Sequence, residues 1–205
     1  MQLMTIPVGP IQSNAYIYYN ETTKEAIMID CGDEAEKLLA VLEQNKLTLK
    51  AILLTHSHFD HISAVATVSA QTGAPVYAGA NELPLLAIEA ATGRKTNVSP
   101  ETAFANGDFF DCAGCRLKVL FTPGHTAGSV CYYDEAAGII FTGDTLFYLC
   151  VGRVDLPTGS WQQMLASFKD VLYTLPKETV VYPGHDQKTT IGFEMTHNQD
   201  LRAEL

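Results

Sequence analysis

The stretch THSHFDH, residues 55–61, places three histidines and one aspartate within seven positions. The whole chain of 205 residues contains only six histidines. The stretch begins at the end of AILLT (51–55), a continuously apolar run that predicts a short buried β-strand. Because side chains two residues apart in extended chain point the same way, His56 and His58 are expected to face a common partner. Asp60 and His61 are adjacent and diverge from that pair.

Three further polar residues follow predicted strands in the same way. They are His125 after RLKVLFT (116–122), Asp144 after GIIFT (138–142) and His185 after TVVY (179–182). Strand ends at one edge of a sheet converge in space, and open α/β sheets place their ligand sites there. We therefore expect residues that are far apart in the sequence to meet at this edge.

This pattern predicts a pair of metal sites. The first would be held by His56, His58 and His125, the second by Asp60, His61 and His185, with Asp144 bridging them through its two oxygens. Imidazole and carboxylate ligands without thiolate suit zinc, iron or manganese. Both sites leave a position for water, which is typical of catalytic rather than structural zinc.

Each residue also has a structural explanation. A single buried histidine is more often a hydrogen-bonded core residue than a ligand, Asp60 could cap the following helix, and Asp144 could belong to a turn. Together, these explanations require five histidines and two aspartates to gather at strand ends by chance. We therefore favour the metal centre, and interpret His197, which lies outside the pattern, as a surface or helix-end residue.

Composition limits the other possibilities. With 47% hydrophobic and 18% charged residues, residues 1–205 are expected to form a single folded domain. The net charge of −10 disfavours a nucleic-acid partner. We recognise no signal peptide and no membrane-spanning run, so we expect a cytoplasmic protein with no membrane partner and reduced cysteines. The role of the CAGC pair, Cys112 and Cys115, is left open.

Strands and helices alternate along the chain. Asp33 is expected to cap a helix that contains Leu38 and Leu42 at helical spacing. Ser160 with Gln163 forms a predicted capping box before a second amphipathic helix. This alternation indicates an α/β fold with a mixed pair of sheets covered by helices.

The ordered motifs THSHFDH, PGH, TGD and a second PGH resemble those of the metallo-β-lactamase superfamily over nearly the whole chain. The resemblance implies an αββα sandwich, two mixed β-sheets flanked by helices. The resemblance also implies the same metal ligands that were predicted above from the spacing of the histidines and aspartates. The segment GDTLFYLCVGRVDLPTG (143–159) is similar to the short bacterial glyoxalase II-like, or hydroxyacylglutathione hydrolase-like, group and to the related persulfide dioxygenases.

The resemblance implies hydrolysis of a small-molecule acyl thioester, such as S-lactoylglutathione, by a hydroxide that bridges two divalent ions. Zinc is the expected metal, with iron or manganese as alternatives, and Asp60 would orient the nucleophile. A basic residue at the position of Arg153 contacts a glutathione carboxylate in glyoxalase II, which implies a substrate-binding role. The alternative is that Arg153 pairs with Asp155 as a strut within the loop. Glyoxalase II also has a C-terminal helical domain that binds glutathione, and this chain stops before it.

Four other functions are considered. A mononuclear iron dioxygenase acting on persulfides would use His56, His125 and Asp144 as a facial triad. A metallo-hydrolase of another substrate is the more general alternative. A β-lactamase is disfavoured because no export signal is recognised. An interaction module without turnover is disfavoured because the ligand set is complete, and the oligomeric state is left open.

Overall fold

The computed structural model describes residues 1–86, 100, 102–202 and 204, and these form two six-stranded sheets. The first sheet contains, in spatial order, β1 (Gln2–Val8), β2 (Ser13–Tyr19), β3 (Glu25–Ile29), β4 (Thr48–Leu53), β5 (Val76–Gly79) and β6 (Thr102–Phe104). The second contains β12 (Thr189–Thr190), β11 (Val180–Pro183), β10 (Ile139–Gly143), β9 (Val130–Asp134), β8 (Cys115–Phe121) and β7 (Phe109–Cys112). Each sheet mixes parallel and antiparallel pairs, since β3 to β6 run parallel in one and β10 and β11 in the other.

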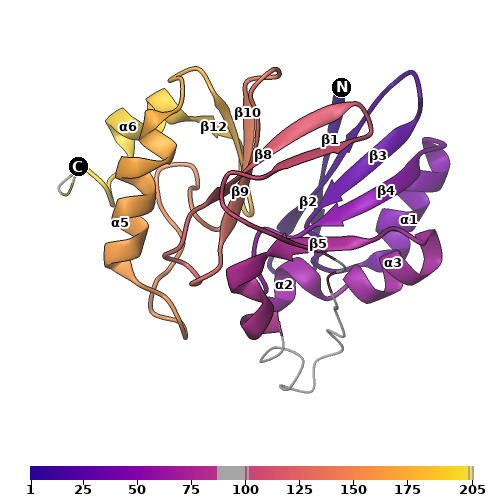
Figure 1. Cartoon of the computed structure of the whole chain (residues 1–205), viewed down its shortest axis with the longest axis horizontal. Coiled ribbons are helices and arrows are strands. Elements are labelled where there is room, and N and C mark those ends of the chain that lie inside the picture. Colours follow the sequence, from indigo (N-terminus) through magenta and orange to yellow (C-terminus); the bar gives the residue numbers. More distant parts are fainter. Residues whose placement is uncertain (87–99, 101, 203, 205) are drawn as a thin grey trace.

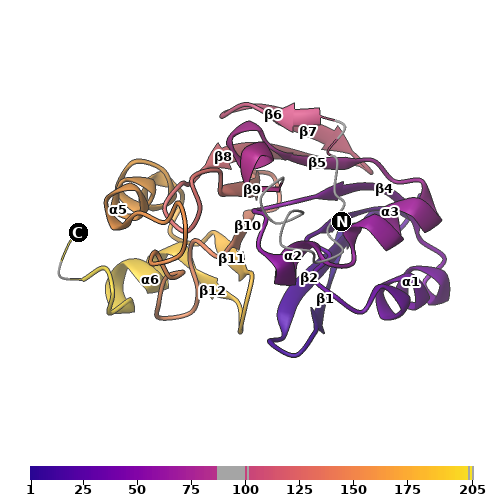
Figure 2. The ribbon, with the colours of Figure 1, turned by 90° about the horizontal axis from the view of Figure 1, so that it is seen from below.

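Helices cover the outer face of each sheet (Figures 1 and 2). The first sheet is covered by α1 (Ala35–Gln44) and α3 (Val65–Thr72), and the second by α5 (Trp161–Asp170) and α6 (Ile191–His197). Shorter elements are α2 (Phe59–Ile62) and the 3₁₀ turns η1 (Ala80–Glu82) and η2 (Leu172–Thr174). In the part of the chain that the structure describes, every helix is too short or too polar to cross a bilayer.

The central strands are buried on both faces. In β3, Ile27 and Ile29 pack between the two sheets, whereas Ala26 and Met28 pack beneath the helices of the first sheet. Successive side chains of a strand point to opposite faces, so a strand in the middle layer must be apolar at every position. This explains why the runs AIMID (26–30) and AILLT (51–55) are almost continuously apolar rather than alternating.

The predicted helix starts have different outcomes. Ser160 caps α5, with its Oγ accepting a hydrogen bond from the Gln163 amide at 3.3 Å. The prediction that Asp33 caps α1 is wrong, because the helix begins after Glu34, which has a left-handed backbone (φ 49°) and no side-chain cap. Asp33 instead accepts a hydrogen bond from the adjacent Glu34 amide at 2.6 Å. His197 is exposed at the end of α6, as expected.

Candidate metal centre

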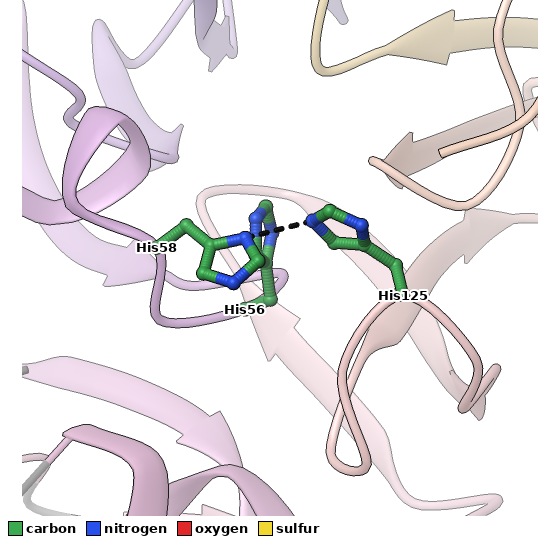
Figure 3. A group of neighbouring side chains, drawn as sticks. All are labelled: His56, His58 and His125. Carbon is green, nitrogen blue, oxygen red and sulfur yellow. Dashed lines mark hydrogen bonds between the residues drawn. The ribbon is translucent and has the colours of Figure 1, made fainter. Parts of the chain in front are cut away.

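The first group of predicted ligands comes from two loops. His56 and His58 follow β4, and His125 follows β8 (Figure 3). One ring nitrogen from each histidine lies within 4.8 Å of the other two, and His58 Nδ1 is 2.8 Å from His125 Nε2. His56 and His125 are buried, with 1% and 2% of their surface exposed. Three imidazole nitrogens therefore face a common point.

The second group contains Asp60, His61 and His185, with one atom of each within 4.8 Å of the others. Asp60 Oδ2 lies 3.4 Å from His61 Nε2 and 3.2 Å from His185 Nε2. Asp60 and His61 belong to α2, the single helical turn after the histidine loop. The residue at the N-cap of α2 is His58, so the alternative capping role of Asp60 is wrong.

Asp144 lies between the two groups, directly after β10. Its Oδ1 is 3.2 Å from His61 Nε2, and its Oδ2 is 3.5 Å from His125 Nε2 and 3.6 Å from His185 Nε2. The structure thus brings together all seven residues that the sequence singled out. Their role as metal ligands stays a prediction.

The donor atoms fit a divalent cation. Among the described residues, His56 Nε2, His61 Nε2 and Asp144 Oδ1 are buried without a hydrogen-bond partner. His61 Nε2 and Asp144 Oδ1 are 3.2 Å apart but do not have hydrogen-bond geometry. Buried polar atoms are nearly always satisfied, so three buried nitrogen and oxygen atoms that face one another without hydrogen bonds fit a bound cation. Nitrogen and oxygen donors without sulfur suit zinc, iron or manganese.

The electrostatics of the two groups differ. Burial, reinforced by neighbouring imidazoles, lowers the pKa of His56 well below its ordinary value and that of His58 to about 4. Both rings are therefore neutral at pH 7, with a lone pair for coordination. Burial alone would lower the pKa of His61, but the Asp144 and Asp30 carboxylates raise it well above its ordinary value. The second group thus attracts positive charge.

A sequence profile of the metallo-β-lactamase superfamily matches residues 8–185, a range that includes all seven converging side chains. The chain belongs to the metallo-β-lactamase superfamily. Two relatives match along the whole chain. The probable metallo-hydrolase YqgX of Bacillus subtilis is 37% identical over 210 residues, which is 99% of each chain. The hydroxyacylglutathione hydrolase GloC of Haemophilus influenzae is 30% identical over 213 residues, 100% of each chain.

Several solved structures share the fold of this chain. BLEG-1 B3 metallo-β-lactamase has a TM-score of 0.91 at 40% identity, covering 98% of this chain and 100% of that one. TTHA1623 in a di-iron-bound form has a TM-score of 0.85 at 40% identity, covering 97% and 100%. ETHE1 from Myxococcus xanthus has a TM-score of 0.86 at 29% identity, covering 100% and 86%. The expected superfamily and the expected αββα fold are confirmed.

Hydrogen bonds behind the predicted ligands orient their rings, and one of the groups that accept them, Asp30, was not predicted from the sequence. Asp30 accepts hydrogen bonds from the Thr55 amide (2.9 Å), the Thr55 hydroxyl (2.8 Å) and His61 Nδ1 (2.8 Å). His125 Nδ1 donates to the Arg153 carbonyl at 2.7 Å. Metal-binding histidines commonly donate their second ring nitrogen in this way, which fixes the ring and its tautomer. The available signal for Asp30 was its place at the end of the apolar run AIMID (26–30).

Both PGH motifs require their glycine. Gly124 has a φ of +148°, and a Cβ there would lie 2.5 Å from the Met164 Cα at the start of α5. Gly184 lies so close to the centre that a Cβ would overlap Asp144 Oδ1 and stand 2.7 Å from His61 Cε1. The backbone of the second motif therefore passes directly against the site, where only glycine leaves room for the ligands.

A cavity of about 550 Å³ opens onto five of the seven side chains, while His56 and His61 lie buried behind them. Among the described residues, its lining is Ile11, His58, Phe59, Asp60, His125, Asp144, Phe147, Arg153, Leu156, Pro157 and His185. Ile11 and Phe59 are 51% and 36% exposed, which is high for large apolar side chains. Apolar walls around a few convergent polar groups are typical of a small-molecule site.

Proposed function

We propose that this chain is a metal-dependent hydrolase that cleaves a small-molecule acyl thioester. The observation that carries the proposal is the pair of three-ligand groups, joined by Asp144, at the base of an apolar cavity. Two divalent ions would be held there, with zinc as the proposed metal. One would bind His56, His58 and His125, the other Asp60, His61 and His185, with Asp144 shared between them.

The chemistry of a thioester matches what these residues provide. When bound, the ions would supply a water of lowered pKa and an electrophile for the carbonyl oxygen. Burial alone would raise the pKa of Asp60, but a hydrogen bond from His185 and the charge of His61 lower it below its ordinary value. Asp60 is thus a carboxylate at neutral pH, and it lines the cavity, where it can accept a hydrogen bond from the attacking water and orient it.

The leaving group explains why no acid catalyst is needed. A thiol has a pKa near 8.5, so a thiolate departs without first being protonated. Among the described residues of the cavity, only the ligands themselves and the always-protonated Arg153 carry titratable groups. Ile11, Phe147 and Leu156 would contact the acyl chain and exclude water around the carbonyl. The similarity to GloC, a hydroxyacylglutathione hydrolase, supports the same substrate class.

Arg153 is proposed to bind a carboxylate on the thiol carrier. It is the only lysine or arginine among the described residues that line the cavity. Its Nε and Nη2 donate to the two oxygens of Asp155 at 2.7 and 2.8 Å, which is the strut geometry considered from the sequence. Both side chains are more than 60% exposed, and exposed ion pairs are weak, so a substrate carboxylate can compete with Asp155 for the guanidinium.

Substitutions of Arg153 and of Asp155 should therefore have opposite effects on KM. We expect Arg153→Gln to raise KM for S-lactoylglutathione about tenfold with kcat unchanged, because one charge-assisted hydrogen-bonding partner is lost. Asp155→Asn should lower that KM, because it frees the guanidinium. The same steady-state kinetics are measured with an uncharged thioester, whose KM should not change in either variant. This comparison distinguishes recognition of the substrate charge from a general distortion of the cavity.

A matched control is available outside the cavity. Arg116 is equally exposed, and its Nε lies 3.8 Å from Asp111 Oδ1, away from the cavity. Arg116→Gln should leave both KM values unchanged. Equal effects of Arg153→Gln on charged and uncharged thioesters would show that Arg153 acts only as a strut.

Iron is the alternative metal, and it would change the chemistry. TTHA1623 has been solved in a di-iron-bound form, and a triad of His56, His125 and Asp144 is the arrangement expected of a mononuclear iron dioxygenase. The complete second group, Asp60 with His61 and His185, favours two ions and hydrolysis.

The deciding experiment combines metal analysis with a substrate panel. Protein purified without added metal is analysed for zinc, iron and manganese, and is then assayed with glutathione and non-glutathione thioesters, a chromogenic β-lactam, and a glutathione persulfide with oxygen uptake. We expect about two ions per chain and thioester hydrolysis. One iron per chain with persulfide-dependent oxygen uptake, or turnover of the β-lactam alone, would replace this proposal.

A further inference from the structure

A further buried carboxylate lies beside His56, His58 and His125, and the proposed reaction does not use it. Glu82, at the end of η1, is 1% exposed. In the described part of the chain it has no ion-pair partner, although an uncompensated buried charge is costly. Hydrogen bonds must therefore stabilise the buried Glu82 side chain. The residues that donate them show which parts of the chain Glu82 connects.

The donors come from both loops that carry the first group of histidines. Glu82 Oε1 accepts from the Ser57 amide at 2.8 Å and from the Ser57 hydroxyl at 2.6 Å. Glu82 Oε2 accepts from the Thr126 hydroxyl at 2.8 Å, and the backbone of Gly128 packs against the same oxygen. Ser57 stands between His56 and His58, and Thr126 directly follows His125. One side chain thus joins the two loops at the residues next to all three imidazoles.

We propose that Glu82 is a positioning residue that fixes the separation of the two histidine loops and so preorganises the first metal site. This inference rests on the metal centre of the proposed function but not on the thioester reaction. The carboxylate suits this task because its two oxygens can accept several hydrogen bonds at once and in fixed directions. Each oxygen serves one loop.

Glutamine has nearly the same shape but cannot replace these bonds. Its amide replaces one acceptor oxygen with an NH₂ donor, whereas both oxygens of Glu82 accept hydrogen bonds. The Ser57 amide faces Oε1, and Gly128 lies so close to Oε2 that a Cβ there would overlap it. We therefore expect Glu82→Gln to loosen one of the two loops, because an NH₂ group at the Oε1 position would face the Ser57 amide and one at the Oε2 position would lose the bond that the Thr126 hydroxyl donates.

The test measures metal binding rather than turnover. Zinc affinity is obtained by competition with a chromophoric chelator, and the cobalt(II)-loaded protein reports ligand geometry through its visible absorption. We expect Glu82→Gln to weaken one of two zinc-binding steps by about 10–100-fold, the range found for residues that orient metal ligands. The cobalt spectrum should change, and the other binding step should not.

Glu194 provides the matched control. It is also a fully buried carboxylate with three donors, the Thr189 hydroxyl (2.6 Å), the Asn198 amide group (2.9 Å) and the Leu149 amide (3.0 Å). None of these donors is adjacent to a predicted ligand. Glu194→Gln should lower thermal stability without altering zinc affinity or the cobalt spectrum. Equal weakening of metal binding in both variants would reduce Glu82 to a general structural role and overturn the proposal.

Milder variants keep the test decisive if Glu82→Gln does not fold. Thr126→Val removes one donor to Oε2 and Ser57→Ala removes one donor to Oε1, and each should weaken the same binding step about threefold to tenfold. Unchanged affinity in both variants would overturn the positioning role. Wild-type protein that binds no zinc would instead overturn the proposed metal centre, so the two failures are distinguishable.

Discussion

Replacing Asp144 by asparagine is expected to lower kcat/KM for thioester hydrolysis by about 10²–10³-fold, the loss typical when one preorganised electrostatic group is removed. Asp144 lies close to both ligand groups. Its Oδ1 is near His61, and its Oδ2 is near His125 and His185. An amide keeps the shape but removes the negative charge, and it turns one of the two oxygens into a donor. Two nearby cations would then repel each other without a shared anion between them.

The measurement is steady-state kinetics with a saturating zinc supply, accompanied by the zinc content of the purified variant. Asp134→Asn is the control, because Asp134 is a buried carboxylate at the last residue of β9 in the same sheet, where it accepts from the Tyr18 hydroxyl at 3.0 Å. That variant should retain activity. Wild-type rates and two zinc ions per chain in Asp144→Asn would contradict the shared-ligand assignment.

The convergence of the site could be predicted from the sequence because strand ends impose it. A continuously apolar run such as AILLT (51–55) predicts a strand of the middle layer, and the residue after it must leave the sheet at the edge. Strand β4 of the first sheet and strands β8, β10 and β11 of the second each deliver polar side chains to the same edge of the sandwich. Topology therefore brings together side chains that are separated by more than a hundred residues.

The supporting residues could not be predicted, because their partners are set by packing between loops. Glu82 is defined by donors 25 and 44 positions away, and nothing in its local sequence distinguishes it from an exposed glutamate. β1 was also not recognised: it contains Pro7, which is tolerated at the edge of a sheet but weakens the local strand signal. Ser160 and Asp33 show the same limit for helix caps, since both have suitable side chains and only Ser160 is placed to accept the bond.

Removing the metal ions should lower the midpoint of thermal unfolding by roughly 8–16 °C. A ligand present at a thousand times its dissociation constant stabilises the folded state by about 4 kcal/mol, and each kcal/mol corresponds to about 2–4 °C for a chain of this size. The structural reason is that His56 Nε2, His61 Nε2 and Asp144 Oδ1 are buried without partners unless an ion is bound. Differential scanning fluorimetry before and after chelation, with zinc restored in the last step, measures the shift.

The same experiment on Asp144→Asn separates this site from any other. With the shared carboxylate lost, zinc affinity falls, so chelation should shift the midpoint of the variant by less than that of the wild type. Asp134→Asn should keep the full shift, because its carboxylate contacts neither ligand group. A shift of the same size in Asp144→Asn, or none in the wild type, would mean that the seven converging side chains do not form the stabilising metal site. The orphaned atoms would then need another partner, since leaving three of them buried costs about 1–3 kcal/mol for each.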